Sequence, residues 1–342
     1  MSPLEVGFDV SPLVQTRAGT ARHVAGLVAA LDEEDGIRVR RYAWGGPGRA
    51  TAAARDIGWY LAGLPARARR DRVDVLHCPT IRAPLGSPAP LVVTVHDLAV
   101  LRHPWAFNRW TREYSARLLP AVTRAADALV AVSEFTKAEL VELVGAPPDK
   151  VTVVPNAVSP TFTATGPAAD GEYVLAVGTL EPRKNLPRLV EGFGRARLDG
   201  CELRVVGARG WGDVRLGGDR VRWLDSVGDQ ELARLYRGAR CVAYVSVYEG
   251  FGLPVLEAMA CGAAVVTSSA PALAEVANGA ALAVDALEPE AIAEGLEEAF
   301  VRRDELGARG VERAAQFTWR DAARRTADVY RAVASRSSSR TR

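Results

Sequence analysis

VSVYEGFGLPVLEAMACGAAVVTSSAPA, from Val245 to Ala272, is the stretch that decides the fold of this chain. It carries two glutamates, Glu249 and Glu257, on either side of a glycine-rich turn. Pro254 stands where an apolar helical run begins, and proline suits the first position of a helix because its missing N–H would be unpaired there anyway. The stretch predicts a loop entering a helix, with Glu249 at the loop rim and Glu257 about one turn into the helix.

Two glycines of the turn, Gly250 and Gly252, allow the backbone to pass close to a ligand. The N–H groups of a helix N-terminus can then face negative charge, and the two carboxylates can accept hydrogen bonds from hydroxyls, as a sugar nucleotide would require. The simpler interpretation is that Glu257 complements the helix dipole and that Glu249 is a solvated charge. A short motif by itself leaves both interpretations open.

Short apolar runs alternate with longer helical patterns along the chain, which indicates βαβ units and parallel sheets. Strands are expected at 6–10, 73–78, 91–97, 128–133, 151–156, 173–178, 201–207, 221–225, 241–246, 263–268 and 280–285. Helices are expected at 20–32, 107–126, 185–197, 229–238, 254–261, 288–300 and 317–334. The segment 159–172 is rich in Pro, Gly, Thr and Ala and is the expected linker.

The predicted fold class is α/β, with two Rossmann-like, doubly wound parallel-sheet domains facing a central cleft. A length of 342 residues favours two domains, because single cores rarely exceed about 250–300 residues. We place the domains at 1–160 and 161–316. A terminal helix at 317–334, with Thr318 as its N-cap, and a polar, disordered tail at 335–342 are expected to follow.

Composition narrows the class of protein. Hydrophobic residues make up 48% of the chain, and the net charge of +2 gives no reason to expect nucleic acid as a partner. Four scattered cysteines without C-x-x-C spacing suit a reducing cytoplasm. The N-terminus has no signal-peptide pattern, and no run approaches the roughly 20 apolar residues that span a bilayer. We expect a cytoplasmic protein. The basic cluster Arg67–Arg72 is either a solvated face or a peripheral contact with acidic lipid at the inner membrane face.

Basic and histidine side chains follow predicted strands at points where they could carry chemistry. Arg183 and Lys184 lie in a loop entering a helix, where a cation could stabilise the charge of a departing phosphate or could simply be solvated. His96 ends another strand and could bind a sugar hydroxyl or be purely structural. Gly19, in the loop before the first helix, would permit close backbone approach to a phosphate. No histidine combines with carboxylates at ligand spacing and no D-x-D occurs, so no metal site is predicted.

The spacing of Glu249 and Glu257 resembles the E-x7-E signature of retaining glycosyltransferases of the GT-B type, family 4. The likeness extends to YVLAVGTLEPRKNLPRLVE at 173–191, PNAV at 155–158, AVSEFTKAEL at 131–140 and TVHDL at 94–98. These blocks occur in the family's order from about residue 6 to residue 334.

The resemblance implies a metal-independent retaining glycosyltransferase. It would move a hexosyl unit, with mannose favoured, from a GDP- or UDP-linked sugar to a glycan, lipid-linked or small-molecule acceptor, with no separate cofactor. The N-terminal domain would bind the acceptor and the C-terminal domain the nucleotide sugar. The terminal helix would pack back on the N-terminal domain.

The resemblance also implies roles for single residues. Arg183 and Lys184 would grip the diphosphate, Glu257 would accept hydrogen bonds from the ribose, and His96 would act on the donor sugar. The remaining donor contacts would come from Glu249, Gly250, Phe251, Gly252 and Leu253, from Gly19, and from the backbone of the turn at 225–232 that includes Val227. One departure is Thr179, which stands where many family members carry an arginine.

Acceptor contacts are expected elsewhere in the chain. Arg22 is a candidate for the donor phosphate or an acidic acceptor. The segment 101–114 combines two tryptophans with two arginines, Trp105, Trp110, Arg109 and Arg112. Such side chains could stack on a sugar, although core packing of the tryptophans is an equally good interpretation.

Other functions were weighed against this one. An NAD-dependent oxidoreductase could also have two doubly wound halves, but the glycines at 207–212 are spaced G-x-x-G-x-G, which is not the dinucleotide fingerprint. A glycosidase would also use two carboxylates, usually from different strands. A non-catalytic relative that only binds sugar nucleotides would not need both glutamates and the basic pair. A Glu249→Ala variant is expected to lose turnover while keeping its fold.

Overall fold

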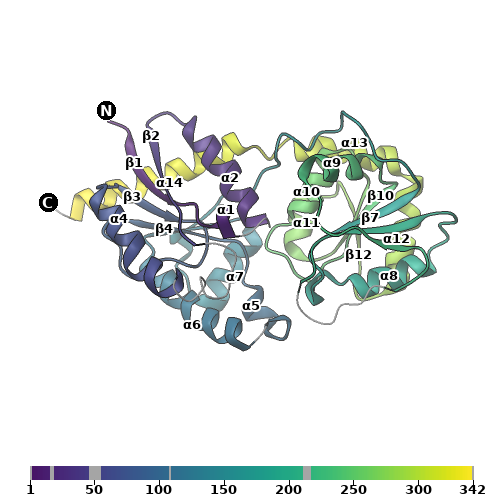
Figure 1. The fold of residues 1–342 in the computed structure, drawn as a ribbon, viewed down its shortest axis with the longest axis horizontal. Coiled ribbons are helices and arrows are strands. Elements are labelled where there is room, and N and C mark those ends of the chain that lie inside the picture. Colours follow the sequence, from purple (N-terminus) through teal and green to yellow (C-terminus); the bar gives the residue numbers. More distant parts are fainter. Residues whose placement is uncertain (1, 16–18, 46–54, 108, 211–216, 341–342) are drawn as a thin grey trace. The chain divides into compact units, whose positions relative to one another are not determined.

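The computed structural model describes residues 2–15, 19–45, 55–107, 109–210 and 217–340. It consists of two compact units (Figure 1). Unit 1 comprises Met1–Ala157 and Thr318–Arg342, and unit 2 comprises Val158–Phe317. The division falls a few residues before the boundary placed at 160 from the sequence, and the terminal helix belongs to unit 1.

Unit 1 is built on a sheet of six parallel strands in the order β2-β1-β3-β4-β5-β6. The strands are β1 (Leu4–Asp9), β2 (Ile37–Tyr42), β3 (Val75–Cys78), β4 (Leu91–Val95), β5 (Ala128–Ala131) and β6 (Val151–Val153). The α-helices are α1 (Pro12–Gln15), α2 (Gly19–Asp32), α4 (Leu64–Arg70), α5 (Ala99–Arg102), α6 (Arg109–Ala125), α7 (Glu134–Val144) and α14 (Trp319–Arg340). The other helical segments, which are not α-helical, are η1 (Arg55–Gly63), η2 (Pro104–Ala106) and η3 (Pro148–Lys150).

Strand β2 was not predicted from the sequence. Its sequence, IRVRRY, alternates apolar and charged residues without forming a continuous apolar run. It lies at the edge of the sheet, where side chains on one face can stay in water. Arg38 and Arg40 both donate to the carboxylate of Glu5 on the neighbouring strand. An edge strand of this kind lacks the hydrophobic signal that identifies the buried strands.

Unit 2 has a second sheet of six parallel strands, in the order β12-β11-β10-β7-β8-β9. The strands are β7 (Tyr173–Val177), β8 (Glu202–Val206), β9 (Val221–Trp223), β10 (Cys241–Tyr244), β11 (Val265–Ser268) and β12 (Leu282–Val284). The helical segments are η4 (Pro182–Lys184), α8 (Leu186–Arg195), α9 (Asp229–Gly238), α10 (Leu253–Ala260), α11 (Pro271–Ala277), α12 (Pro289–Val301) and α13 (Arg303–Ala314). The strand order reverses between β7 and β10, the switch point at which open α/β sheets bind ligands.

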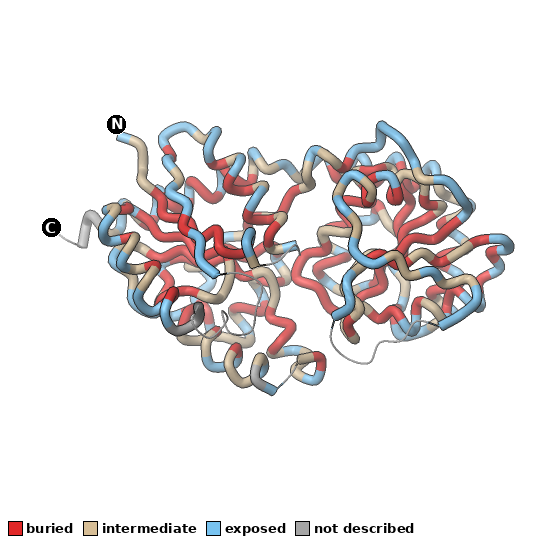
Figure 2. Tube along the Cα trace, in the orientation of Figure 1, coloured by how far each residue is buried: buried red, intermediate tan, exposed pale blue. Residues whose placement is uncertain are grey.

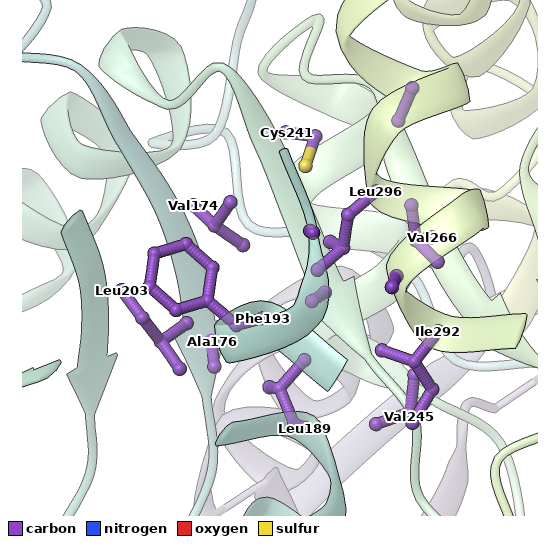
Figure 3. Close-up of a cluster of buried hydrophobic side chains, with 14 of the residues drawn as sticks. Val174, Ala176, Leu189, Phe193, Leu203, Cys241, Val245, Val266, Ile292 and Leu296 are labelled. Carbon is purple, nitrogen blue, oxygen red and sulfur yellow. The ribbon is translucent and has the colours of Figure 1, made fainter. Parts of the chain in front are cut away.

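Buried residues lie mainly on the strands of each sheet and along parts of the helices (Figure 2). In unit 2, apolar side chains of the strands pack against Phe193 of α8 and against Ile292 and Leu296 of α12 (Figure 3). All four cysteines are buried free thiols. In the described residues, no helix is both long and apolar enough to cross a membrane.

Helix α14 packs against the sheet of unit 1 and against α2. Its N-terminus is capped as expected, because the Thr318 hydroxyl accepts a hydrogen bond from the backbone N–H of Asp321 at 3.1 Å. The hydroxyl of Tyr330 lies 2.5 Å from Nδ1 of the buried His77. The helix continues to Arg340, so the prediction of a disordered tail is wrong for 335–340, and 341–342 lie outside the described residues.

Burial of histidines makes the stability of unit 1 depend on pH. Burial lowers the pKa of His77 to about 3, against an unfolded value of about 6.5. The neutral ring is favoured in the folded state, so its stabilising contribution is complete above about pH 6.5 and is lost as the pH falls towards 3. Protonation linked to His77 alone should lower the free energy of unfolding by about 2 kcal/mol between pH 6.5 and pH 5. Urea unfolding across this range should show a shallower pH slope for a His77→Gln variant than for the wild-type chain. Equal slopes would contradict this account.

Candidate active site

Helix α10 begins at the glycine-rich turn. Gly252 is its N-cap with a φ of 108°, in the left-handed region. A Cβ atom there would also lie 2.4 Å from Cδ2 of Leu273, so both conformation and space require glycine. Pro254 occupies the second helical position, after Leu253, whereas the sequence analysis expected it at the first. Among the described residues, no side chain caps this helix N-terminus.

Glu249 lies in a buried ion-pair cluster, which corrects its expected position at the loop rim. The residue is 8% exposed. Its Oε2 atom is 3.0 Å from Nη1 of Arg183, and its Oε1 atom is 2.6 Å from Nζ of Lys184. The interpretation of Glu249 as a solvated charge is therefore wrong. Glu249 instead joins the loop after β10 to the loop after β7, on the two central strands of the sheet.

Arg183 is directed at acceptors within the protein. Its Nη1 atom also donates to the Tyr248 carbonyl at 3.0 Å, and its Nη2 atom donates to the buried carboxylate of Glu181 at 2.8 Å. In return, the Arg183 carbonyl accepts the backbone N–H of Val247. This arginine holds the two loops together.

Lys184 lies beside Arg183 but has different neighbours. Its Nζ atom donates to the hydroxyl of Tyr244 at 2.7 Å and to Glu249, and its alkyl chain passes over Gly178. An ammonium group has three donors. Across the described part of the chain, two of them have protein acceptors, and the third remains available to a ligand. The Lys184 side chain as a whole is 13% exposed.

The cluster is fully ionised at neutral pH. Burial alone would raise the pKa of Glu249, but the charges of Lys184 and Arg183 lower it to about 2. Burial alone would lower the pKa of Lys184, but the Glu249 carboxylate and Tyr244 outweigh it and keep that pKa above its usual value. Burial raises the pKa of Tyr244 to about 12, so its hydroxyl stays protonated and donates to Glu249.

Glu257 lies one turn or so into α10, as expected, and is 2% exposed. Its Oε2 atom accepts a hydrogen bond from the hydroxyl of Tyr236 on α9 at 3.3 Å. The two glutamates of the motif therefore have different partners: Glu249 contacts the loop after β7, and Glu257 contacts α9. Gly250 and Phe251 between them are buried, and the Phe251 ring packs against that of Phe317.

Val227 lies in the loop between β9 and α9, directly before the N-cap residue Gly228. Two other predicted site residues belong to unit 1. Gly19 is the first residue of α2, and the preceding residues 16–18 lie outside the described part. His96 follows β4, and its Nε2 atom is 2.9 Å from the Pro79 carbonyl. A carbonyl only accepts, so Nε2 carries the proton. Burial lowers the pKa of His96, so the neutral ring can accept a hydrogen bond at Nδ1.

Acceptor candidates are placed only in part. Trp105 is 62% exposed, and the exposed Arg109 pairs with Glu113 one turn along α6. Arg112 is exposed on the same helix, and Arg22 lies in the first turn of α2. The side chain of Trp110 lies outside the described residues.

Three buried polar residues support the site and were missed by the sequence analysis. Glu181 neutralises Arg183, and Tyr244 bridges Lys184 and Glu249. Asn185 is 3% exposed and donates to the carbonyls of Val245 and Ala286. Only Tyr244 carried a usable signal, because a tyrosine in a buried strand needs a partner for its hydroxyl. In the described residues, no group of three or more His, Cys, Asp or Glu could hold a metal ion.

Comparison with known proteins identifies the family. Residues 161–317 match the family described as "Glycosyl transferases group 1", and residues 17–162 match "Glycosyltransferase Family 4". The chain is 32% identical over 265 residues to O-antigen chain mannosyltransferase B of Escherichia coli, covering 70% of each chain. This chain belongs to the family 4 glycosyltransferases.

Other relatives agree with this assignment. The glycosyltransferase is 32% identical to D-inositol 3-phosphate glycosyltransferase of Kineococcus radiotolerans, across 71% of this chain and 66% of the relative. The chain spans 62% to 70% of the length of this mannosyltransferase and of three D-inositol 3-phosphate glycosyltransferases. None of the relatives named here is an oxidoreductase.

Solved structures share the GT-B fold. Sucrose-phosphate synthase from Thermosynechococcus elongatus superposes with a TM-score of 0.78 at 21% identity, covering 96% of this chain and 98% of that one. HepE of Anabaena, in complex with UDP-glucose, superposes with a TM-score of 0.73 at 17% identity, covering 96% and 100%. The expected fold class, two parallel α/β sheets of the GT-B type, is confirmed.

The cluster predicts a stability cost for losing Glu249. A Glu249→Gln variant would leave Arg183 and Lys184 buried side by side without their shared counter-ion. We expect its free energy of unfolding to fall by about 3–5 kcal/mol, measured by urea denaturation. The same change at Glu297, which pairs with the exposed Arg197, should lower the free energy of unfolding far less, because solvent screens that ion pair.

Equal losses for the two variants would contradict the proposed counter-ion role. The expected loss of turnover in Glu249→Ala stays a prediction. Because we also expect removal of this carboxylate to lower stability, activity alone does not isolate its role.

Proposed function

We propose that the glycosyltransferase moves a hexosyl unit from a nucleotide-diphosphate sugar to a hydroxyl acceptor, with retention of configuration and without a metal ion. Mannose from a GDP-linked donor is favoured over a UDP-linked sugar because the mannosyltransferase relative of Escherichia coli matches this chain over 70% of its length. The acceptor is a glycan, a lipid-linked sugar or a small polyol phosphate, the last suggested by the name of the D-inositol 3-phosphate glycosyltransferase relative.

One observation carries the proposal, namely the position of Lys184. This charged ammonium lies at the strand-order switch of unit 2, is held by Glu249 and Tyr244, and keeps one donor for a ligand. The start of α10, which no side chain caps in the described structure, follows the neighbouring strand β10. Cations and helix N-termini stabilise phosphate oxygens. Lys184 and the α10 N-terminus are therefore the proposed contacts of the diphosphate.

Arg183 acts in this proposal as a positioning residue. Its amino groups face Glu181, Glu249 and the Tyr248 carbonyl, so it orients Glu249 and through it Lys184. Glu249 and Glu257, with the backbone from Gly250 to Leu253, are proposed to hold the donor sugar, the phosphates and the ribose.

The proposed transfer needs no strong base from the protein. The bond between the anomeric carbon and the β-phosphate oxygen breaks, and the acceptor oxygen forms a new bond to that carbon on the same face of the sugar. The released phosphate oxygen takes the proton of the acceptor hydroxyl. Lys184 donates to the phosphate as its negative charge grows. His96, a neutral ring that accepts at Nδ1, is proposed to accept a hydrogen bond from a donor-sugar hydroxyl. Gly19 is proposed to face a phosphate, and the backbone at Val227 the base.

Removing the cation tests the proposal. Lys184→Met should lower the rate of nucleotide release from the preferred sugar nucleotide by about 100- to 1,000-fold, because a preorganised donor to the leaving group is lost. Arg195→Met, the loss of an exposed cation at the far end of α8, should stay within about twofold of wild type. The donor is chosen by a thermal-shift panel containing GDP-mannose, UDP-glucose and NADH, because a ligand bound only to the folded state raises its Tm.

Two results would overturn the proposal. Turnover by a folded Lys184→Met variant at the level of Arg195→Met would remove the role of the ammonium. A sugar nucleotide that raises the Tm of the wild-type protein, without any release of nucleotide or transfer to an acceptor, would favour the non-catalytic alternative.

We also propose that unit 1 touches acidic lipid. A pocket of about 450 Å³ is lined by Arg40, Arg41, Tyr42, Ala43, Arg67, Arg70 and Asp71. Leu61, on the helical segment that leads into α4, is 62% exposed. Clustered arginines, and an exposed apolar side chain on the adjoining helical segment, suit the surface of an acidic bilayer.

Vesicle sedimentation tests this contact. An Arg67→Gln/Arg70→Gln variant should bind phosphatidylglycerol-containing vesicles about 10- to 30-fold more weakly than the wild type, because each arginine near such a surface contributes about 1 kcal/mol. The matched Arg324→Gln/Arg325→Gln variant on α14 should bind normally. Equal binding to neutral and acidic vesicles by the wild type would contradict the proposal.

A further inference from the structure

The loop after β8 is held tightly against the loop after β7. The N–H of Leu180 donates to the Ala208 carbonyl at 3.0 Å, and Leu180 pairs with Arg209 in an isolated parallel bridge. A Cβ at Gly207 would lie 1.9 Å from the Gly178 carbonyl oxygen, so only glycine permits this approach. Arg209 therefore has a fixed place at the carboxyl edge of the sheet, beside the loop that carries Lys184.

The guanidinium of Arg209 is oriented by a tryptophan. Its Cζ atom lies 4.7 Å from the ring centroid of Trp223, at the end of β9. The indole N–H of Trp223 donates to the Gly207 carbonyl at 2.8 Å, and the Gly207 N–H donates to the Asp225 carbonyl at 3.0 Å. These bonds join Arg209 and Trp223 to the turn that contains Val227, where the nucleobase is expected.

Arg209 is exposed, and its donors are uncommitted. In the described ranges, no carboxylate or carbonyl accepts a hydrogen bond from its guanidinium. Arg220 gives the contrast: its Cζ atom also lies 4.7 Å from an aromatic centroid, that of Phe193, but its Nη1 atom donates to the Leu198 carbonyl at 2.8 Å. Arg209 also lies over an aromatic ring but has no such acceptor. The N–H donors of its planar guanidinium, which form a fork, therefore remain available to a ligand.

The sheet places Arg209 where the base of a bound nucleotide would lie. With the diphosphate at Lys184, after β7, the ends of β8 and β9 lie one and two strand spacings away, about 5 and 10 Å. A ribose and a base extend over a similar length. This step rests on the proposed function, because it takes the diphosphate position from Lys184.

The chemistry of the fork distinguishes the bases. Guanine presents two adjacent acceptors, N7 and O6, which match two parallel N–H groups of arginine. Adenine has a donor in place of O6, and uracil offers no adjacent pair of acceptors along one edge. We propose that Arg209, supported by Trp223, reads the N7/O6 edge of guanine and makes the glycosyltransferase select GDP-linked donors.

Binding of four nucleoside diphosphates tests the proposal. For the wild-type chain, isothermal titration should give GDP and inosine diphosphate, which share N7 and O6, a lower Kd than ADP and UDP by roughly 10- to 100-fold. In Arg209→Ala the preference for GDP over UDP should fall to within about threefold, with little change in the Kd of UDP. Arg222→Ala, the loss of another exposed arginine on β9, should keep the wild-type preference.

Arg209→Lys separates base reading from simple charge. Lysine keeps the charge but loses the fork, so it should lose the preference for GDP as the alanine variant does. If Arg209→Ala weakens GDP and UDP equally and lysine restores both, the side chain contacts a phosphate and the proposal is overturned. A wild-type preference for UDP, or a GDP preference that survives Arg209→Ala, would also overturn it.

These failures are distinct from failure of the proposed function. If Lys184→Met turns over normally, or if no nucleoside diphosphate binds the wild type, both proposals fall. If nucleotide release depends on Lys184 but the four diphosphates bind equally, only the role of Arg209 falls.

Discussion

The shared carboxylate of Glu249 is the interaction on which the site depends. Two cations, Arg183 and Lys184, are largely buried next to each other, and each would be costly to bury alone. Glu249 reaches both with its two oxygens, and Tyr244 completes the network through its hydroxyl. The loops after β7 and β10 are thereby tied together at the point where the strand order reverses. Without Glu249 the ammonium would keep only the Tyr244 hydroxyl among its two protein acceptors.

The glycine-rich turn connects the loop that carries Glu249 to helix α10. Gly252 adopts a φ of 108° in close contact with Leu273, so α10 can begin immediately after the turn. Glu249 precedes the start of α10 by only a few residues and contacts the β7 loop. Glu257 lies within α10 and contacts Tyr236. The motif spacing reflects two different tasks: one glutamate balances cations, and the other faces the neighbouring helix.

Sequence patterns predicted the fold well where burial gives a strong signal. The apolar strands, and the division of the chain into two sheets, were predicted from such runs. Strand β2 was not predicted, because its charged residues face water at the sheet edge. The contacts among the candidate site residues were not predicted. Nothing in the sequence shows that Arg183 meets Glu181 and Glu249, because the partner Glu249 is 66 residues away. The stacking of Arg209 on Trp223 depends in the same way on a fold that brings two loops together.

The charge balance of the cluster determines how it can meet a diphosphate. Arg183 and Lys184 are matched by Glu181 and Glu249, so the four side chains carry no net charge. In the proposed function, attraction of a phosphate therefore does not come from excess positive charge of this cluster. It comes from direction, because Lys184 keeps one N–H for a ligand while Glu249 holds the ammonium in place and charged. A preorganised donor of this kind needs no rearrangement when charge develops on the leaving oxygen, which is the condition for lowering the barrier rather than only binding the substrate.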